Sequence, residues 1–399
     1  MLGEQITDKK KSGKISKVVQ SIPPSGIREF FDLVMGRDDI ISLGVGEPDF
    51  TTPWHIREAC IYSLEKGYTT YTSNQGLAEL RELICEEIHQ DQRITYSPDS
   101  VLITTGVSEA SDLAMRAILN PGEEVLVPEP SYVSYKPCIS LAGGTPVPME
   151  TEREDEFRLT PEQLEKQITP KTRAVILSYP NNPTGAIMEK KHLEELTDAI
   201  NEHNLIVISD EVYGKLTYNK KHTSITTLNG MKEQTIILNG FSKSHAMTGL
   251  RIGYAIAPEE IIDAMNKIHQ YTMLCAPITA QMGAIEALQN GNAEMEKMKK
   301  EYNRRRRVFV RGLNRIGLDC ATPGGAFYAF PSITATGLGS EEFAAQLLTE
   351  QQVAAVPGNA FGKSGEGHIR CSYATSLEEL KIALERIEQF VEKSLLGRN

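Results

Sequence analysis

One lysine lies in a setting that suits covalent chemistry. Lys243 follows an aliphatic run, residues 235–238, that breaks at Asn239 and Gly240 as a buried strand does at its end. Further along, Arg251 lies between two glycines, where the backbone can approach a ligand closely. A neutral lysine can form a Schiff base with a carbonyl compound, and an arginine fork suits a phosphate. A lysine between two serines is also typical of a solvated loop, so the rest of the chain must decide.

A carboxylate and an asparagine follow two other aliphatic runs. Residues 205–209 end at Asp210, and residues 174–177 lead into the loop SYPNNPTG, which contains Asn182. A carboxylate at the end of a buried strand is costly unless it is paired, so Asp210 calls for a cationic partner. Capping of the next helix is the alternative for Asp210. For the loop, whose shape the prolines restrict, the alternative is a rigid turn of self-bonded asparagines.

The sequence predicts a parallel sheet that would position these residues. From Val101 onward, short apolar runs alternate with helical patterns, which predicts βαβ units. Four runs end near Thr105, Leu177, Ser209 and Asn239, and open parallel sheets bind ligands at such ends. The first end leads through a glycine into a predicted helix, whose free N–H groups suit an anion. Beyond residue 300 the pattern becomes that of a smaller α+β unit, which the N-terminal segment is expected to join.

Composition excludes several classes of function. The chain has 399 residues, enough for two domains, with 40% hydrophobic and 24% charged residues. A net charge of -11 argues against nucleic acid as a partner. The six cysteines show neither CxxC nor histidine spacing, which indicates reduced thiols in a cytoplasmic protein and no metal site. No apolar run approaches the ~18 residues of a membrane span, and the basic N-terminus lacks the apolar core of a secretory signal. The basic run at residues 304–307 is interpreted as a solvated helix face.

Five motifs together resemble one family. In chain order they are GEPDF, PNNPTG, DEVY, SKSHAMTGLRIGY and IRCSYA, and they resemble the class I/II aminotransferases, the pyridoxal 5'-phosphate (PLP) enzymes of fold type I. The resemblance extends from about Ile22 to the C-terminus and is greatest to prokaryotic aspartate, aromatic and N-acetyl-diaminopimelate aminotransferases. It implies an α/β fold, with a large domain on a mostly parallel sheet flanked by helices and a smaller α+β domain. The implied parts are a flexible arm (1–21), an N-terminal segment of the small domain (22–54), the large PLP-binding domain (55–299) and the small domain (300–399).

The resemblance implies a role for each residue of the cofactor site. Lys243 would hold PLP covalently, and Asp210 would keep the ring nitrogen protonated. Tyr132 would stack on the ring, while Asn182 and Tyr213 would bond its phenolic oxygen. The catalytic residues are then Lys243, Asp210 and Tyr213. The phosphate would be bound by the following residues: Gly106, Val107, Ser108, Ser242, Arg251 and, across a homodimer interface, Tyr71 of a second copy. Gly240 stands where many relatives carry a phosphate-binding serine, and Ser242 is expected to replace it.

The substrate is implied to lie beside Gly46, Asn182 and Arg370. Arg370 would clamp its α-carboxylate with two hydrogen bonds. From the residues alone, Arg370 is equally a surface charge on an edge strand, the turn at Gly46 a tight connection, and Tyr71 an ordinary packed tyrosine with a wet hydroxyl.

The resemblance implies an aminotransferase that moves an amino group between an L-amino acid, such as aspartate or an aromatic one, and a 2-oxo acid such as 2-oxoglutarate. The mechanism would be ping-pong. A PLP-dependent C–S β-lyase of the same fold is the alternative, and a non-catalytic PLP-binding regulator is a third reading. The expected partners are these small substrates and a second copy of the chain, with no nucleic acid and no membrane. Aspartate, alanine, aromatic and acyl-diaminopimelate donors all remain open.

Overall fold

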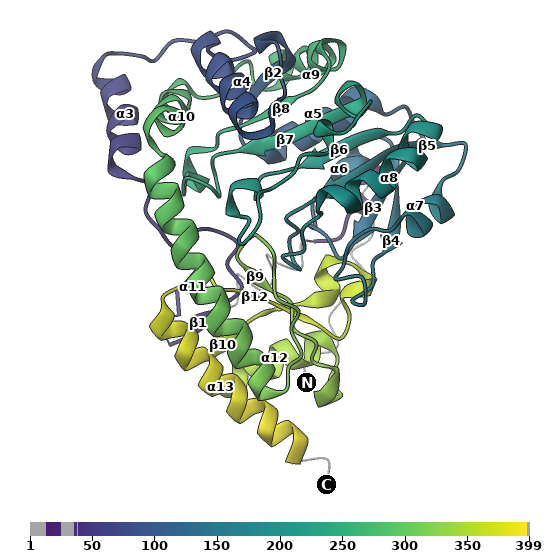
Figure 1. The fold of residues 1–399 in the computed structure, drawn as a ribbon, viewed down its shortest axis with the longest axis vertical. Coiled ribbons are helices and arrows are strands. Elements are labelled where there is room, and N and C mark those ends of the chain that lie inside the picture. The colour runs from purple at the N-terminus through teal and green to yellow at the C-terminus, as the bar shows by residue number, and fades with distance from the viewer. Residues whose placement is uncertain (1–12, 25–35, 38, 397–399) are drawn as a thin grey trace.

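A seven-stranded sheet forms the centre of the larger part of the computed structural model, which describes residues 13–24, 36–37 and 39–396 (Figure 1). The strands lie side by side in the order β2-β8-β7-β6-β5-β3-β4. Their bounds are β2 Val101–Thr104, β3 Glu124–Glu129, β4 Thr145–Glu150, β5 Thr172–Ser178, β6 Ile206–Asp210, β7 Thr235–Gly240 and β8 Gly253–Ile256. Within this sheet β8 runs antiparallel to both neighbours, and the other pairs are parallel. The mostly parallel sheet is the one that the sequence predicts.

Helices cover both faces of this sheet because the strands are apolar on both faces. All four residues of β2 and of β8 are buried, for example. One face packs against α5 (Val107–Ile118), α6 (Tyr135–Leu141) and α9 (Glu259–Thr272). The other face packs against α7 (Pro161–Gln167) and α8 (Lys190–Glu202) at one end. At its other end it packs against α3 (Trp54–Glu65), α4 (Ala78–Gln92) and α10 (Ile278–Asn290).

A smaller α+β part lies below the sheet in Figure 1, and the long helix α11 (Asn292–Ile316) extends into it. Its antiparallel sheet has the order β11-β12-β9, from Val356–Pro357, Ile369–Ser372 and Tyr328–Ala329. Helices α12 (Ser340–Gln351) and α13 (Leu377–Leu396) pack with α11 around a core of its own. Strand β1 (Ile41–Ser42) pairs in parallel with β10 (Val353–Ala354), which joins the N-terminal segment to this smaller part.

Two expectations from the sequence need correction or lie outside the described residues. The basic run in α11 is a solvated face only in part, because Arg304 and Arg307 are exposed whereas Arg305 and Arg306 are buried. Arg306 lies over the ring of Tyr218, and its guanidinium bonds the carbonyl oxygen of Pro323. The sequence also predicts a short amphipathic helix that ends near Gly36, with Ile27, Phe30, Phe31 and Val34 on one face, but this helix falls largely on residues 25–35, outside the described ranges. Residues 1–12 of the expected arm are also outside, whereas Lys17–Ser21 forms the short helix α1.

None of the helices in the described part of the chain combines the length and the apolar character that a membrane crossing requires.

Arg305 allows a test of how α11 holds the N-terminal segment. Its Nη1 lies 2.9 and 2.8 Å from the carboxylate oxygens of Asp49, and its Nε donates to Glu301 at 3.0 Å. Arg305→Met leaves Asp49 without this partner, so we expect the free energy of unfolding to fall by about 2 kcal/mol. Arg304→Met is the matched control, because that side chain is 56% exposed while Arg305 is 8% exposed. Urea unfolding checks both variants, and equal midpoints would contradict the assigned role.

Candidate active site

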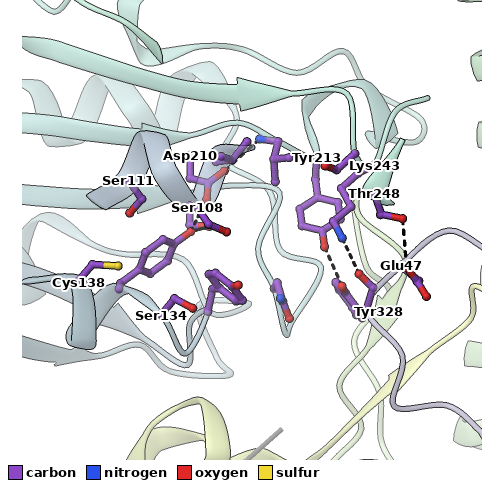
Figure 2. Close-up of a pocket in the computed structure, with 18 of the residues that line it drawn as sticks. Glu47, Ser108, Ser111, Ser134, Cys138, Asp210, Tyr213, Lys243, Thr248 and Tyr328 are labelled. Atoms are coloured by element: carbon purple, nitrogen blue, oxygen red, sulfur yellow. Dashed lines mark hydrogen bonds between the residues drawn. The ribbon is translucent and has the colours of Figure 1, made fainter. Parts of the chain in front are cut away.

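A cavity of about 440 Å³ opens at the carboxyl edge of the large sheet (Figure 2). It has the size of a small-molecule site. The loops after β5, β6 and β7 line it, together with the start of α5 and the loop after β1. Two residues of the smaller part, Tyr328 on β9 and Arg370 on β12, complete the wall. The strand ends therefore meet at one place, as the alternating pattern predicts.

Lys243 projects into this cavity from the turn that follows β7. Its Nζ donates a hydrogen bond of 2.6 Å to the carbonyl oxygen of Gly46. The pKa of Lys243 is lowered to about 8, chiefly by burial; the positive charges of Arg370 and Arg251 contribute to the lowering, and the negative charges of Glu47 and Asp210 oppose it. A larger fraction of this amine is therefore neutral near physiological pH than in an exposed lysine. A neutral amine is the form that attacks a carbonyl group and accepts a proton.

One corner of the cavity is built for an anion. Helix α5 begins at Val107, so the free N–H groups of its first turn and its dipole favour negative charge there. Gly106, with a φ of +82°, precedes it, and a Cβ at this position would lie 2.5 Å from Nη2 of Arg251. Arg251 reaches this corner because it precedes β8, whose reversed direction brings its first residue to the carboxyl edge. The buried Ser242 and the first-turn Ser108 also line the cavity.

Asp210 is the last residue of β6 and is buried at the cavity wall. Its Oδ1 accepts a hydrogen bond of 3.1 Å from the N–H of Val212, and its Oδ2 accepts one of 2.7 Å from the hydroxyl of Tyr135. Burial raises the pKa of Asp210, and the Tyr135 bond is the largest effect in the opposite direction. No ion pair forms between Asp210 and any described cation, which leaves the carboxylate able to pair with a cationic group of a ligand.

Arg370 lies on the opposite wall, in the buried strand β12. Its Nη1 donates to Oδ1 of Asn182 at 2.9 Å, and its Nη2 donates to the carbonyl oxygen of Gly44 at 2.6 Å. Its Nε is buried and has no hydrogen-bond partner among the residues that the structure describes. The guanidinium lies over the rings of Tyr328 and Phe361, 4.6 and 4.8 Å from their centroids. Arg370 is thus no surface charge, and it forms no ion pair with a carboxylate of the described residues.

Two tyrosines connect the walls. The hydroxyl oxygens of Tyr213 and Tyr328 lie 2.7 Å apart, and both side chains line the cavity next to Lys243 (Figure 2). Burial raises the pKa of Tyr213 well above its ordinary value, so its hydroxyl remains protonated. Tyr132 also lines the cavity, with its ring edge-to-face against Tyr135 at 5.6 Å.

The structure brings most of the residues singled out from the sequence to this one cavity. The lining includes Gly46, Val107, Ser108, Tyr132, Asn182, Asp210, Tyr213, Ser242, Lys243, Arg251 and Arg370. Gly106 adjoins it. Tyr71 is the exception, because it lies on the outer surface with 80% of its area exposed. The two asparagines of the PNNPTG loop make different contacts. Asn181 bonds the N–H and hydroxyl of Thr184, as a turn asparagine does, whereas Asn182 faces Arg370.

Several lining residues received no role from the sequence, among them Glu47, Thr248, Tyr328 and Tyr135. Thr248 donates to Glu47 at 3.1 Å across the mouth of the cavity (Figure 2). Glu47 and Thr248 lie inside recognised motifs, which is a usable signal, whereas Tyr135 and Tyr328 lie in none of the five motifs. Their orientation toward the cavity, however, depends on contacts between segments far apart in the chain.

Comparison with known proteins gives a consistent result. The family model described as aminotransferase class I and II matches residues 38–387. The chain is 54% identical over 381 residues to YugH of Bacillus subtilis (strain 168), covering 95% of this chain and 99% of that one. It is 47% identical over 379 residues to an aspartate aminotransferase of Pyrococcus abyssi, covering 94% and 97%. The crystal structure of an aromatic aminotransferase from Pyrococcus horikoshii superposes with a TM-score of 0.87 at 47% identity, covering 92% and 99%.

The lowered pKa of Lys243 predicts its reactivity. In the protein freed of bound small molecules, the capture of an aldehyde by Lys243, trapped with borohydride, should increase with pH around a midpoint near 8. An ordinary lysine would give a midpoint near ~10.4. Mass spectrometry of the peptide containing Lys243 measures the modified fraction, and Lys243→Ala is the control that should show no adduct there. A midpoint near the ordinary value would contradict the burial argument.

Proposed function

Because the chain belongs to the class I and II aminotransferases, which are PLP-dependent enzymes of fold type I, we propose that the cavity at the sheet edge is its transamination site. Lys243, Asp210 and Tyr213 are the catalytic residues in this proposal. An amino acid and a 2-oxo acid are its two substrates. The C–S β-lyase and regulator readings have no support from the family or from its aspartate and aromatic relatives.

The residues at the cavity fit PLP in three separate places. The start of α5, with Ser242 and Arg251, offers N–H, hydroxyl and guanidinium donors to a phosphate. Asp210, buried and without a cationic partner among the described residues, suits a protonated ring nitrogen. Lys243 has the lowered pKa that an imine-forming lysine needs. When bound, PLP supplies a ring that accepts the negative charge left on the substrate's α-carbon.

The buried guanidinium of Arg370 is the observation that carries the proposal. A buried cation without an anionic partner is costly, and its unused Nε–H adds an unsatisfied donor. The α-carboxylate of an amino acid would provide both the charge and the acceptor. Asn182 and the stacked ring of Tyr328 hold the guanidinium in place. Arg370 therefore orients the substrate so that its α-carbon faces Lys243 on the same cavity.

The proton transfers fall to Lys243. Near physiological pH its amine is partly neutral, so it could accept the proton of the α-carbon as a general base and then give that proton up again as a general acid. The carbonyl oxygen of Gly46, which accepts a hydrogen bond from Nζ, keeps the amine pointed into the cavity. Tyr213 keeps its proton, so its hydroxyl could donate a hydrogen bond to the phenolic oxygen of PLP.

We further propose aspartate and aromatic amino acids as the donors to test first, with 2-oxoglutarate as acceptor. An aspartate aminotransferase and an aromatic aminotransferase are both 47% identical to this chain.

The proposed domain division has four parts. An arm of residues 1–21 comes first, the segment 22–54 and the residues 300–399 form the small domain, and residues 55–299 form the large domain. Six cysteines without disulfides in the described structure agree with a cytoplasmic location.

The active form is proposed to be a homodimer. Large apolar side chains are exposed on and near α3, which is unusual for a monomer's surface. They are Trp54, Ile61, Tyr62, Leu64, Tyr68, Tyr71, Tyr271, Met273 and Leu274. The side chain of Asn74 donates to the carbonyl oxygen of Leu274 at 2.6 Å, so the loop that carries Tyr71 lies beside the end of α9, which carries Tyr271. A second copy would cover this surface and allow Tyr71 to reach the partner's phosphate corner.

Product analysis tests the function. With PLP supplied, a donor that the enzyme accepts should be converted to its 2-oxo acid, and one glutamate should form from 2-oxoglutarate for each donor consumed. Lys243→Ala should lower this rate by at least about a thousandfold, since the general base and covalent anchor are both lost. Chromatography of both products is the measurement. Release of ammonia and pyruvate without consumption of the oxo acid would show a lyase instead.

Subunit mixing tests the role of Tyr71. Tyr71→Ala should reduce activity several-fold and Lys243→Ala should abolish it, each as a homodimer. When the two variants are unfolded together and refolded, mixed dimers contain one site with both residues intact. We therefore expect activity above the sum of the separate variants. If Tyr71 served its own subunit, mixed dimers would contain no intact site, and mixing would restore nothing.

A further inference from the structure

The contacts behind Asp210 carry an inference about how its charge is controlled. We propose that Tyr135 is a positioning residue, which with Ser178 keeps the Asp210 carboxylate ionised and oriented toward the ring nitrogen of the cofactor. This inference rests on the proposed function of the cavity. It concerns a tyrosine that the motifs of the chain leave without a role.

Hydrogen bonds connect the side chains of Ser178, Tyr135 and Asp210 in series. The hydroxyl oxygen of Tyr135 lies 2.7 Å from Oδ2 of Asp210 and 2.9 Å from Oγ of Ser178. The carboxylate can only accept, so the single hydrogen of the phenol goes to Asp210. The phenol oxygen then accepts from the hydroxyl of Ser178. All three side chains are buried, on α6, β5 and β6, so water does not compete for these bonds.

The surroundings of Asp210 explain why it needs this donor. Burial raises the pKa of Asp210, and the neighbouring Glu211 raises it too. The bond from Tyr135 is the largest opposing effect, followed by the N–H of Val212 and the positive charge of Lys243. Glu211 is occupied elsewhere, with its carboxylate bonded to Ser209, His222 and Ser224. Without Tyr135, one N–H would be the sole hydrogen-bond donor to Asp210 among the described residues.

Tyr135 is suited to this role because it does not lose its own proton. Burial and the charge of Asp210 raise the pKa of Tyr135 well above its ordinary value. The hydroxyl therefore donates over the whole working pH range. Its ring packs in the core between the sheet and α5, so a phenylalanine would keep the packing and remove the donor alone.

Loss of the hydroxyl should make Asp210 more basic. A proton shared between the carboxylate and the ring nitrogen would then move toward the carboxylate, and the ring would accept charge less well. Substrate binding through Arg370 would be unaffected, because that residue lies on the opposite wall. The predicted signature is a change in ring protonation and in kcat, with KM preserved.

The test compares Tyr135→Phe with Tyr179→Phe in the holoenzyme. Tyr179 is also buried and hydrogen-bonded, its hydroxyl accepting from the N–H of Leu159 at 3.0 Å and donating to the carbonyl oxygen of Phe157 at 3.2 Å. The readouts are the NMR shift of ¹⁵N in the ring of labelled PLP, and kcat and KM for an accepted donor. For Tyr135→Phe we expect the ¹⁵N signal to move from the protonated toward the neutral range and kcat to fall about tenfold, the scale of one hydrogen bond to a charged group. KM should stay within about twofold. Tyr179→Phe should leave the ¹⁵N signal at its wild-type position.

An unchanged ¹⁵N signal in a folded Tyr135→Phe would overturn the proposal and leave Tyr135 a packing residue. If that variant does not fold, Ser178→Ala decides, since it removes the donor to the phenol oxygen. A smaller movement of the ¹⁵N signal in the same direction would support the proposed series of hydrogen bonds. No movement of the signal would overturn the proposal. Failure of the proposed function would look different, because the wild-type protein itself would then show no bound PLP or no transamination.

Discussion

The gathering of like charges around one cavity, with Arg370 fully buried, is the constraint on which the site depends. Lys243, Arg251 and Arg370 face the same space, and two of these positive charges help to lower the pKa of the third to about 8. A protein interior tolerates such an arrangement only if anions arrive from outside. The phosphate of PLP and the carboxylate of an amino acid are two such anions. The energetic cost of bringing these positive charges together and the affinity for anionic ligands therefore have the same origin.

Sheet topology makes this convergence possible. Strands β5, β6 and β7 are parallel, so Asn182, Asp210 and Lys243 follow ends that lie at one edge. The reversed strand β8 brings Arg251 to that edge from the opposite chain direction. The smaller α+β part then closes the far wall with Arg370, which is held by Asn182 of the larger part. The proposed substrate contact and the contact between the two parts thus share one side chain, and a ligand on Arg370 would act directly on the junction.

Much of this arrangement could be predicted from the sequence, for a physical reason. A strand that is buried on both faces is written as a continuous aliphatic run, and its end is marked by glycine or a polar residue, so residues 235–240 predict both β7 and the position of Lys243 beyond it. The basic run in α11 shows where such reasoning fails. Arg305 and Arg306 have the composition of a solvated face but are buried, because Asp49 and the ring of Tyr218 come from distant segments. The local pattern of charges does not show which distant residues will cover these side chains.

The sequence by itself therefore determined the elements, their order, and the chemical types at each strand end, since these depend on the backbone and on nearest neighbours. The tertiary structure alone decided which groups touch. It placed the Nε of Arg370 beyond reach of any partner, set the hydroxyl of Tyr135 against Asp210, and left Tyr71 on the outer surface. The burial of a group, and the pKa change that burial causes, depend on all the atoms around that group, and these atoms come from distant parts of the chain. A local stretch of sequence therefore does not determine the burial or the pKa of its residues.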